Sequence, residues 1–289
     1  MKHLMHPFVL HNEQIRALPE VSLSPGQTGL LSGWGVFSTL RVVEGVPFAF
    51  ERHWNRMRED ARRLRVPFPA QEGETLSALM RLIEANRAYD AALRVTVIRN
   101  HGGIWSGPAT GPGYDLIAFT APIHEHPAGV HLTVRPFGRA AASAFRGVKS
   151  IAWGPNLAIL EEAHANGFDE VILLNERGEV SECVSANLFV AEGSKVWTPP
   201  LDSGCLAGVT REMLLSEVRL DGVSIAEKTL YPEDFDRSGE VFITSTTRGL
   251  LPVFSIEGRP LGRSSNILPR LQEAYLRVVG DYVRQWERV

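Results

Sequence analysis

The chain has 289 residues, with 30 Lys and Arg against 33 Asp and Glu, a net charge of −3, and 44% hydrophobic residues. This composition is that of an ordinary folded protein and argues against nucleic-acid or membrane-surface partners. Two cysteines, Cys183 and Cys205, are too few for a disulfide framework. No apolar run reaches transmembrane length, and residues 1–6 do not begin a signal-peptide core, so we expect a cytoplasmic protein.

The first half of the chain predicts a mixture of strands and amphipathic helices. Strands are expected at Phe8–His11, 36–43, 93–99 and 114–120, and helices at 51–65 and 75–88. The first helix should end near Pro67, because the residue before a proline disfavours helical geometry. A loop rich in Gly and Pro over 100–113 is long enough to serve as a lid over a site.

In the second half, a proline-bounded connection at 121–127 is the candidate domain boundary. Strands are then expected at 130–137, 170–174, 180–190 and, last, 241–244, and helices at 157–166, from Val209 onward and at 267–286. His124 and His126 are spaced as metal ligands can be, but no carboxylate or thiol cluster supports them, so no metal is expected. The mixture of hairpins and helices favours the α+β class over a regular βαβ array.

Lys149 is the candidate for catalytic chemistry. It lies between a strand pattern and a helix pattern and precedes the apolar residues Ile151, Ala152 and Trp153. Desolvation lowers the pKa of a lysine and frees its amine to react with an aldehyde. The alternative is a surface lysine whose apolar stem packs on the protein.

Glu182 lies in a strand pattern that mixes small polar residues with apolar ones. A carboxylate facing inward there needs a cationic partner, and a protonated pyridine nitrogen would serve. The alternative is an edge-strand glutamate that faces water.

Two segments could bind an anion. Residues 206–211 open a helix whose free N–H groups and Thr210 hydroxyl suit a phosphate, although such a start also serves as plain capping. Residues 245–247 follow a strand and supply further hydroxyl groups. Arg56 shares the helix from residue 51 with Arg52, Arg58, Arg62 and Arg63, where a solvated basic face explains most of them and one could reach a phosphate. No nucleophile elbow, phosphate loop or dinucleotide fingerprint competes with these segments.

In this order, the segments resemble the class IV pyridoxal-phosphate aminotransferases, which include branched-chain aminotransferases, D-amino-acid aminotransferases and aminodeoxychorismate lyases. The resemblance covers nearly the whole chain and is carried by residues 146–150, 181–189, 206–211 and 244–247, with weaker support from 35–41 and 52–57. It implies a homodimeric two-domain α+β enzyme of fold type IV with pyridoxal 5'-phosphate. A small N-terminal α/β domain would span 1–120, an interdomain connection and first strand 121–135, and a large cofactor-binding domain with a β-barrel-like core 136–289.

The resemblance also implies roles for individual residues. Lys149 would form the internal aldimine and then move the proton from the substrate Cα to the cofactor, while Glu182 would pair with the pyridine nitrogen. Further residues would hold the phosphate or pack on the ring: Arg56, Leu206, Val209, Thr210, Ser245 and Thr246.

Four residues are expected to face the substrate: Phe37, Arg94, Thr247 and Arg248. Arg94 aligns with an arginine that branched-chain enzymes use near the substrate carboxylate, although Ala92 stands where their neighbouring tyrosine would be. Phe37 stands where D-amino-acid enzymes tend to carry a tyrosine. Arg248 is expected either to grip a carboxylate or to face solvent.

We therefore expect a transaminase that passes an amino group from a small apolar or branched-chain amino acid to a 2-oxo acid. A pyruvate-eliminating aminodeoxychorismate lyase is the alternative, since residues 37–39, 182–183 and 186–189 look like the lyase versions, whereas 245–247 look like the aminotransferase version. A D-amino-acid or (R)-amine donor also stays open. A non-catalytic dimer is disfavoured because Lys149, Glu182 and Arg56 occur together.

Overall fold

The computed structural model describes residues 5–24, 26–103, 112–262 and 266–286. The chain divides into two compact units, each with its own hydrophobic core. The first unit comprises Met1–His124, Val148–Trp153 and Tyr282–Val289, and the second comprises Glu125–Gly147 and Gly154–Asp281. The domain ranges expected from the sequence stay predictions. These units differ from them by grouping Val148–Trp153 and the end of the chain with the first unit.

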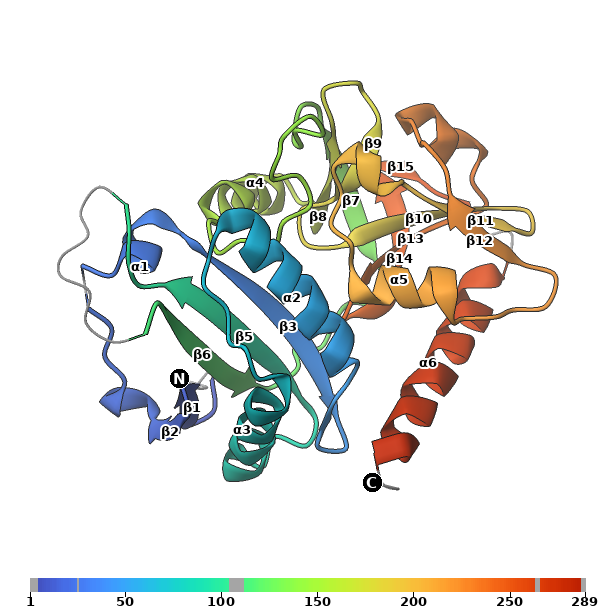
Figure 1. Ribbon diagram of the computed structural model, residues 1–289. Helices are drawn as coiled ribbons and strands as arrows, with labels where there is room; N and C mark the ends of the chain where they lie inside the picture. Colours follow the sequence, from blue (N-terminus) through green and yellow to red (C-terminus); the bar gives the residue numbers. More distant parts are fainter. Residues whose placement is uncertain (1–4, 25, 104–111, 263–265, 287–289) are drawn as a thin grey trace. The chain divides into compact units, whose positions relative to one another are not determined.

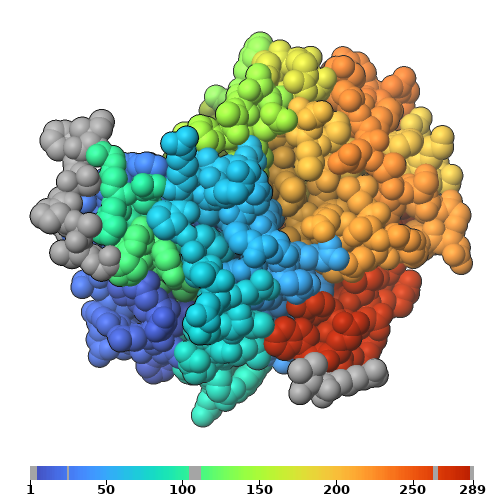
Figure 2. Space-filling model, viewed as in Figure 1, coloured from blue at the N-terminus to red at the C-terminus, as the bar shows by residue number. Residues whose placement is uncertain are grey.

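Among its described residues, the first unit is built on a six-stranded antiparallel sheet with the order β2-β1-β6-β5-β3-β4 (Figure 1). The strands are β1 Phe8–His11, β2 Gln14–Ala17, β3 Gly35–Val43, β4 Val46–Pro47, β5 Ala91–Arg99 and β6 Tyr114–Ala121. The helical segments are η1 Leu18–Glu20, α1 Thr28–Ser32, α2 Phe50–Leu64 and α3 Glu72–Asn86. In Figure 2 the α2 and α3 segments, blue to teal, form much of the surface of this unit that is turned to the viewer.

Helix α2 follows from its apolar spacing. Trp54, Met57 and Ala61 recur at helical intervals, and all three are buried against the sheet. The helix ends where Arg65 adopts a left-handed conformation, with φ of 56°, just before Val66 and the expected stop at Pro67. This helix therefore lies where the sequence predicted it.

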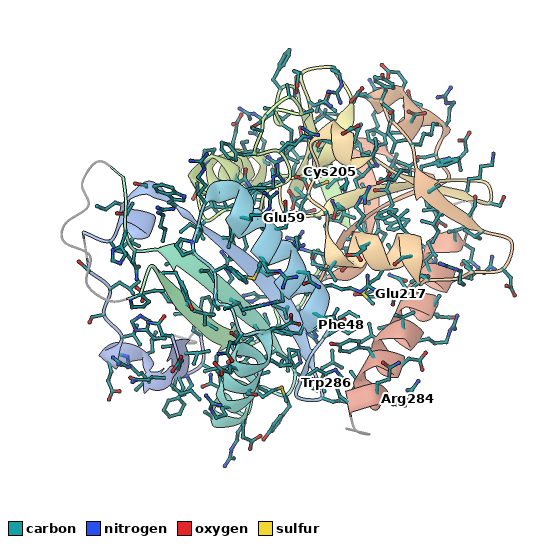
Figure 3. The ribbon with its side chains drawn as sticks, in the orientation of Figure 1. Phe48, Glu59, Cys205, Glu217, Arg284 and Trp286 are labelled. Atoms are coloured by element: carbon teal, nitrogen blue, oxygen red, sulfur yellow. The ribbon has the colours of Figure 1, made fainter. Side chains whose placement is uncertain are left out.

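Two distant segments complete the first unit. The Lys149 segment pairs with β3, because Phe37 N donates to Lys149 O at 3.1 Å and Ile151 N donates to Gly35 O at 3.1 Å. At the end of α6 (Ile267–Trp286), the Tyr282 ring meets Phe48 edge-on at 5.2 Å; Figure 3 labels Phe48. Strand pairing thus fixes the backbone on which Lys149 lies.

In the described part of the second unit, a nine-stranded sheet runs in the order β12-β11-β10-β13-β14-β7-β8-β9, with β15 on β14. Its strands are β7 Val130–Arg135, β8 Glu170–Leu174, β9 Val180–Cys183, β10 Asn187–Glu192, β11 Lys195–Thr198, β12 Ser224–Glu227, β13 Glu240–Ser245, β14 Gly249–Ile256 and β15 Arg259–Pro260. The helical segments are α4 Gly154–Ala165, η2 Leu201–Ser203, α5 Val209–Ser216, η3 Pro232–Arg237 and most of α6. No described helix is both long enough and apolar enough to cross a membrane.

The single strand expected over 180–190 is wrong. Cys183 N donates to Ala186 O at 2.8 Å, and this tight turn separates β9 from β10. Because β9 ends the sheet path and β10 lies well inside it, the turn brings the path back on itself and the sheet curls. The expected β-barrel-like core of an α+β fold is confirmed by this curled sheet.

Other expected elements need smaller corrections. Strand 241–244 is not the last one, because β14 follows it despite Pro252, a residue that argues against a strand interior. Helices α3 and α4 each begin three residues earlier than predicted. Of the expected lid over 100–113, residues 104–111 lie outside the described part of the chain.

Candidate active site

In the first unit, Lys149 is half-buried and its amine lies in aromatic surroundings. Its Nζ is 4.7 Å from the centroid of the Phe37 ring and 5.9 Å from that of Trp153. The two rings meet edge-on at 6.1 Å. These surroundings are those of a partly desolvated amine rather than of a solvent-exposed lysine.

Arg94 places a second cation on the Phe37 ring. Its guanidinium carbon is 3.4 Å from the ring centroid. Phe37 lies opposite Thr96 in the β3–β5 register, so Arg94 is its diagonal neighbour on the same face of the sheet. Burial lowers the pKa of Arg94 to about 10, which leaves it cationic at neutral pH. No carboxylate in the described part of the chain pairs with this guanidinium.

Arg56, the residue predicted to bind phosphate, is oriented by a buried hydroxyl. Its Nη2 donates to Ser38 Oγ at 2.7 Å, and that oxygen lies 2.7 Å from His53 Nδ1. Burial, with the charges of Arg56 and Lys149, lowers the pKa of His53 well below its usual value. The ring is therefore neutral, and its Nδ1 shares a hydrogen bond with the Ser38 hydroxyl.

Asp60 was missed by the sequence analysis. Its Oδ2 accepts the main-chain N–H of Lys149 at 3.2 Å, and the side chain is 4% exposed. Burial raises its pKa to about 6, although the Lys149 N–H and the charges of Arg56, Arg63 and Lys149 act in the opposite direction. The sequence could have indicated Asp60, because it lies four residues after Arg56 on the predicted helix and so shares the helix face of that candidate phosphate-binding residue.

In the second unit, Glu182 on β9 is buried and does not face water as an edge residue would. Its Oε1 accepts Arg139 Nε at 2.9 Å and its Oε2 accepts Leu206 N at 3.0 Å. Each oxygen of a carboxylate has two lone pairs, so another N–H donor can still be accommodated. Nothing in the sequence pointed to Arg139 as its partner.

The start of α5 fits a phosphate. Asn187 Nδ2 donates to Leu206 O at 2.9 Å, and a Cβ at Gly208 would overlap Asn187 Oδ1, so a larger residue there would displace the Asn187 side chain. The first intrahelical bond runs from Glu212 N to Gly208 O, which leaves the N–H groups of Val209 and Thr210 without acceptors inside the helix.

A buried hydroxyl lies on the same side of the sheet as this helix start. Thr244 pairs with Asn187 across β13 and β10, so both side chains project from one face. Among the described residues, Thr244 Oγ1 is buried without a hydrogen-bond partner. An unmatched buried hydroxyl beside a helix N-terminus suits an anionic ligand.

The end of β13 and the residues that follow it are partly buried. Ser245, Thr246, Thr247 and Arg248 are all half-buried. Arg248 Nη1 donates to Glu170 Oε2 at 3.3 Å, and Ser185 Oγ donates to the same oxygen of this buried carboxylate. Arg248 thus has an internal partner, whereas the sequence analysis considered only a substrate carboxylate or solvent.

Both thiols are buried, and burial raises the pKa of Cys183 well above its usual value and that of Cys205 to about 11. They are therefore unreactive near neutral pH. The first unit offers the Lys149 amine, and the second offers the Glu182 carboxylate and the anion-binding start of α5. Each of these is a group that an aldehyde cofactor with a pyridine ring and a phosphate requires.

The family model described as "Amino-transferase class IV" matches residues 35–256. The chain belongs to the class IV aminotransferase family. Membership confirms the family predicted from the sequence, and with it a pyridoxal-phosphate-dependent aminotransferase as the class of enzyme and pyridoxal 5'-phosphate as the cofactor.

Relatives within the class IV family carry different names. The branched-chain-amino-acid aminotransferase of Salmonella typhimurium is 27% identical, over 88% of this chain and 87% of the relative. The D-alanine aminotransferase of Bacillus licheniformis is 27% identical over 93% and 97%, and the aminodeoxychorismate lyase of Bacillus subtilis is 27% identical over 91% and 92%. The chain is equally identical to relatives with three different named activities, so sequence identity does not distinguish between their substrates.

The fold agrees with that of solved class IV enzymes. The structure of the branched-chain amino acid aminotransferase from Escherichia coli superimposes with a TM-score of 0.85 at 25% identity, over 95% of this chain and 94% of that one. A hypothetical aminotransferase from Mycobacterium tuberculosis, solved in its pyridoxal-phosphate-bound form, superimposes with a TM-score of 0.80 at 22% identity, over 94% and 98%. These likenesses concern the fold, and they confirm the two-domain fold-type IV architecture.

Proposed function

We propose that this class IV enzyme is a transaminase that passes an amino group from a small apolar or branched-chain amino acid to a 2-oxo acid. The observation that carries the proposal is the group formed by Arg94, Phe37 and Lys149, in which a guanidinium and an amine share one aromatic ring. A guanidinium without a carboxylate partner suits the carboxylate common to amino and 2-oxo acids. The rings of Phe37 and Trp153 suit an apolar substrate side chain.

Bound pyridoxal phosphate supplies an electron sink for the bond broken at the substrate Cα. Lys149 Nζ would accept the proton from the substrate Cα and deliver it to the cofactor. Glu182 would accept the N–H of the pyridine ring and so favour the protonated ring. Arg139 and the N–H of Leu206 hold the Glu182 carboxylate in place for this role.

We assign the contacts to the cofactor phosphate and ring to the residues predicted for them from the sequence. The N–H groups of Val209 and Thr210 would donate to the phosphate at the start of α5. Arg56, oriented by Ser38, would add a charged donor. The remaining contacts are proposed for Ser245 and Thr246 at the phosphate, Leu206 on the ring and Thr247 at the substrate.

A half-reaction tests the function. The purified protein, loaded with pyridoxal phosphate, is mixed separately with L-leucine, D-alanine, (R)-1-phenylethylamine and aminodeoxychorismate while visible absorbance and released pyruvate are followed. Conversion to pyridoxamine phosphate by L-leucine supports the proposal. Conversion by D-alanine or by (R)-1-phenylethylamine alone would overturn the proposed donor class. Steady pyruvate release from aminodeoxychorismate without an acceptor would identify the enzyme as a lyase.

The role of Lys149 is tested by Lys149→Ala, for which turnover should be lost. Lys195→Ala removes an exposed lysine and serves as the matched control, with activity expected to match the wild type. Turnover retained by Lys149→Ala would overturn the mechanism, whatever the donor.

We also propose a homodimer in the cytoplasm. Phe137 is 81% exposed and Phe145 55% exposed, and such apolar side chains suit a subunit interface. Free buried thiols suit a reducing compartment. Light scattering should give twice the 31.9 kDa of one chain, and a monomer at micromolar concentration would contradict the proposed assembly.

A further inference from the structure

Asp60 is a buried carboxylate of the first unit to which the proposed reaction assigns no role. It lies on α2 and accepts the main-chain N–H of Lys149 at 3.2 Å. The Lys149 carbonyl is held from the other side by Phe37 N at 3.1 Å. The backbone of Lys149 is therefore held on one side by β3 and on the other by a single helix side chain.

The charges around Asp60 come from its own helix and from the lysine that it holds. Arg56 and Arg63 lie on α2, and the positive charges of both, with that of Lys149, favour the ionised carboxylate. Burial acts against ionisation and raises the pKa of Asp60 to about 6, so the group is mostly ionised at pH 7. Its interaction with Lys149 is mutual, because a carboxylate stabilised by a nearby ammonium also stabilises that ammonium.

The rest of the α2 face is already neutral or positive. His53 is uncharged, and Arg56 is oriented by the Ser38 hydroxyl. Arg94 adds a further positive charge on the Phe37 ring that Lys149 also contacts. Asp60 thus supplies negative charge beside a lysine that shares an aromatic ring with the cation Arg94.

We propose that Asp60 is a positioning residue for Lys149, which holds the lysine backbone through its carboxylate and, through its negative charge, favours protonation of the lysine side-chain nitrogen. This inference rests on the proposed role of Lys149 as the cofactor-linked lysine. A purely structural Asp60 would hold the backbone equally well as an amide, so charge and hydrogen bond can be separated by substitution.

Three variants separate the two effects. Asp60→Asn keeps an oxygen acceptor for the Lys149 N–H and removes the charge, whereas Asp60→Ala removes both. Glu59→Gln is the matched control, because Glu59 is the next carboxylate on α2 and is exposed, as labelled in Figure 3. All three are compared with the full-length wild-type holoenzyme.

The main readout is a pH titration of the absorbance of the lysine-linked cofactor without substrate. Removing a nearby negative charge lowers the pKa of a protonated nitrogen, so the midpoint should fall by about half a unit to one unit in Asp60→Asn. Asp60→Ala should show the same shift and should also lose cofactor about 10-fold faster during dialysis, because a charge-assisted hydrogen bond is missing. Glu59→Gln should match the wild type in both measurements.

A second readout separates failure of this inference from failure of the proposed function. Each protein is reduced with borohydride, and the residue that carries the cofactor is identified by mass spectrometry. Wild-type protein without label at Lys149 would overturn the function itself. Label at Lys149 with an Asp60→Asn midpoint equal to that of Glu59→Gln would leave the function standing and overturn the role of Asp60.

Discussion

The guanidinium carbon of Arg94 lies 3.4 Å from the centroid of the Phe37 ring, on neighbouring strands of one sheet. The antiparallel register makes the two residues diagonal neighbours on one face, so strand pairing sets this contact. A cation at this position on an aromatic ring is stabilised by about 0.5–2 kcal/mol. The pair therefore holds a positive charge in place without a carboxylate from the described residues.

Arg94→Met should raise the KM for the amino-acid donor about 10- to 100-fold, because a charge-assisted contact to the carboxylate is lost. An amine donor without a carboxylate, such as (R)-1-phenylethylamine, should show no loss. Arg41→Met serves as the control, since Arg41 lies on the same strand as Phe37 and pairs with the exposed Asp90. Steady-state kinetics check this prediction, and an equal loss for both kinds of donor would contradict it.

Glu182→Gln should lower kcat about 100-fold or more with little change in the KM of the donor, because the amide cannot favour protonation of the pyridine ring. The variant still offers an oxygen to Leu206 N, so the backbone contact has an acceptor. Arg139→Met is the companion variant, since it removes the cation while Glu182 stays. Rapid-quench or stopped-flow rates of the half-reaction measure the effect, and an unchanged kcat would rule out the assigned role.

Gly208→Ala should weaken cofactor retention, because the new Cβ would overlap Asn187 Oδ1 and displace the start of α5. Loss should be larger for pyridoxal phosphate than for pyridoxal, which has no phosphate to hold. Gly73→Ala is the control, since a Cβ at that helical glycine meets nothing within 4 Å. Equilibrium binding of both compounds tests this, and an equal loss for the two would place the phosphate elsewhere.

Asp60→Asn should stabilise the cofactor-free protein at pH 7 and not at pH 4. The folded pKa of Asp60, about 6, lies above the usual value of about 3.9, so the folded state binds more protons between these pH values. The contribution of Asp60 is therefore most favourable below pH 4 and is lost as the pH rises through 6. The variant lacks this loss and should gain on the order of 1–3 kcal/mol at pH 7.

Denaturant unfolding at pH 4 and pH 7 measures that difference. Glu59→Gln should show no comparable pH-dependent gain, because Glu59 is exposed. A gain in Asp60→Asn that is the same at both pH values would mean that the side chain is not ionised in the folded protein in the way described.

Local patterns in the sequence determined the positions of the long helices, the family and the cofactor. Helical periodicity located α2, and α6 spans the predicted 267–286, because an amphipathic helix shows its buried face within a few turns. Composition and motif order marked the Lys149 segment, Glu182 and the start of α5 as candidate site residues, and their roles stay predictions. Family membership and cofactor followed from them and are confirmed by the match over residues 35–256.

Only the tertiary structure decided how these residues are partnered. The β9–β10 turn could not be distinguished from a continuous strand, because the same mixture of small polar and apolar residues runs through both strands without a Gly or Pro between them. Glu182 meets Arg139, Arg248 meets Glu170, and Lys149 meets Asp60 across long separations in the chain. Such pairs depend on strand register and helix packing, which no local pattern encodes, and they set the charges around the candidate catalytic groups.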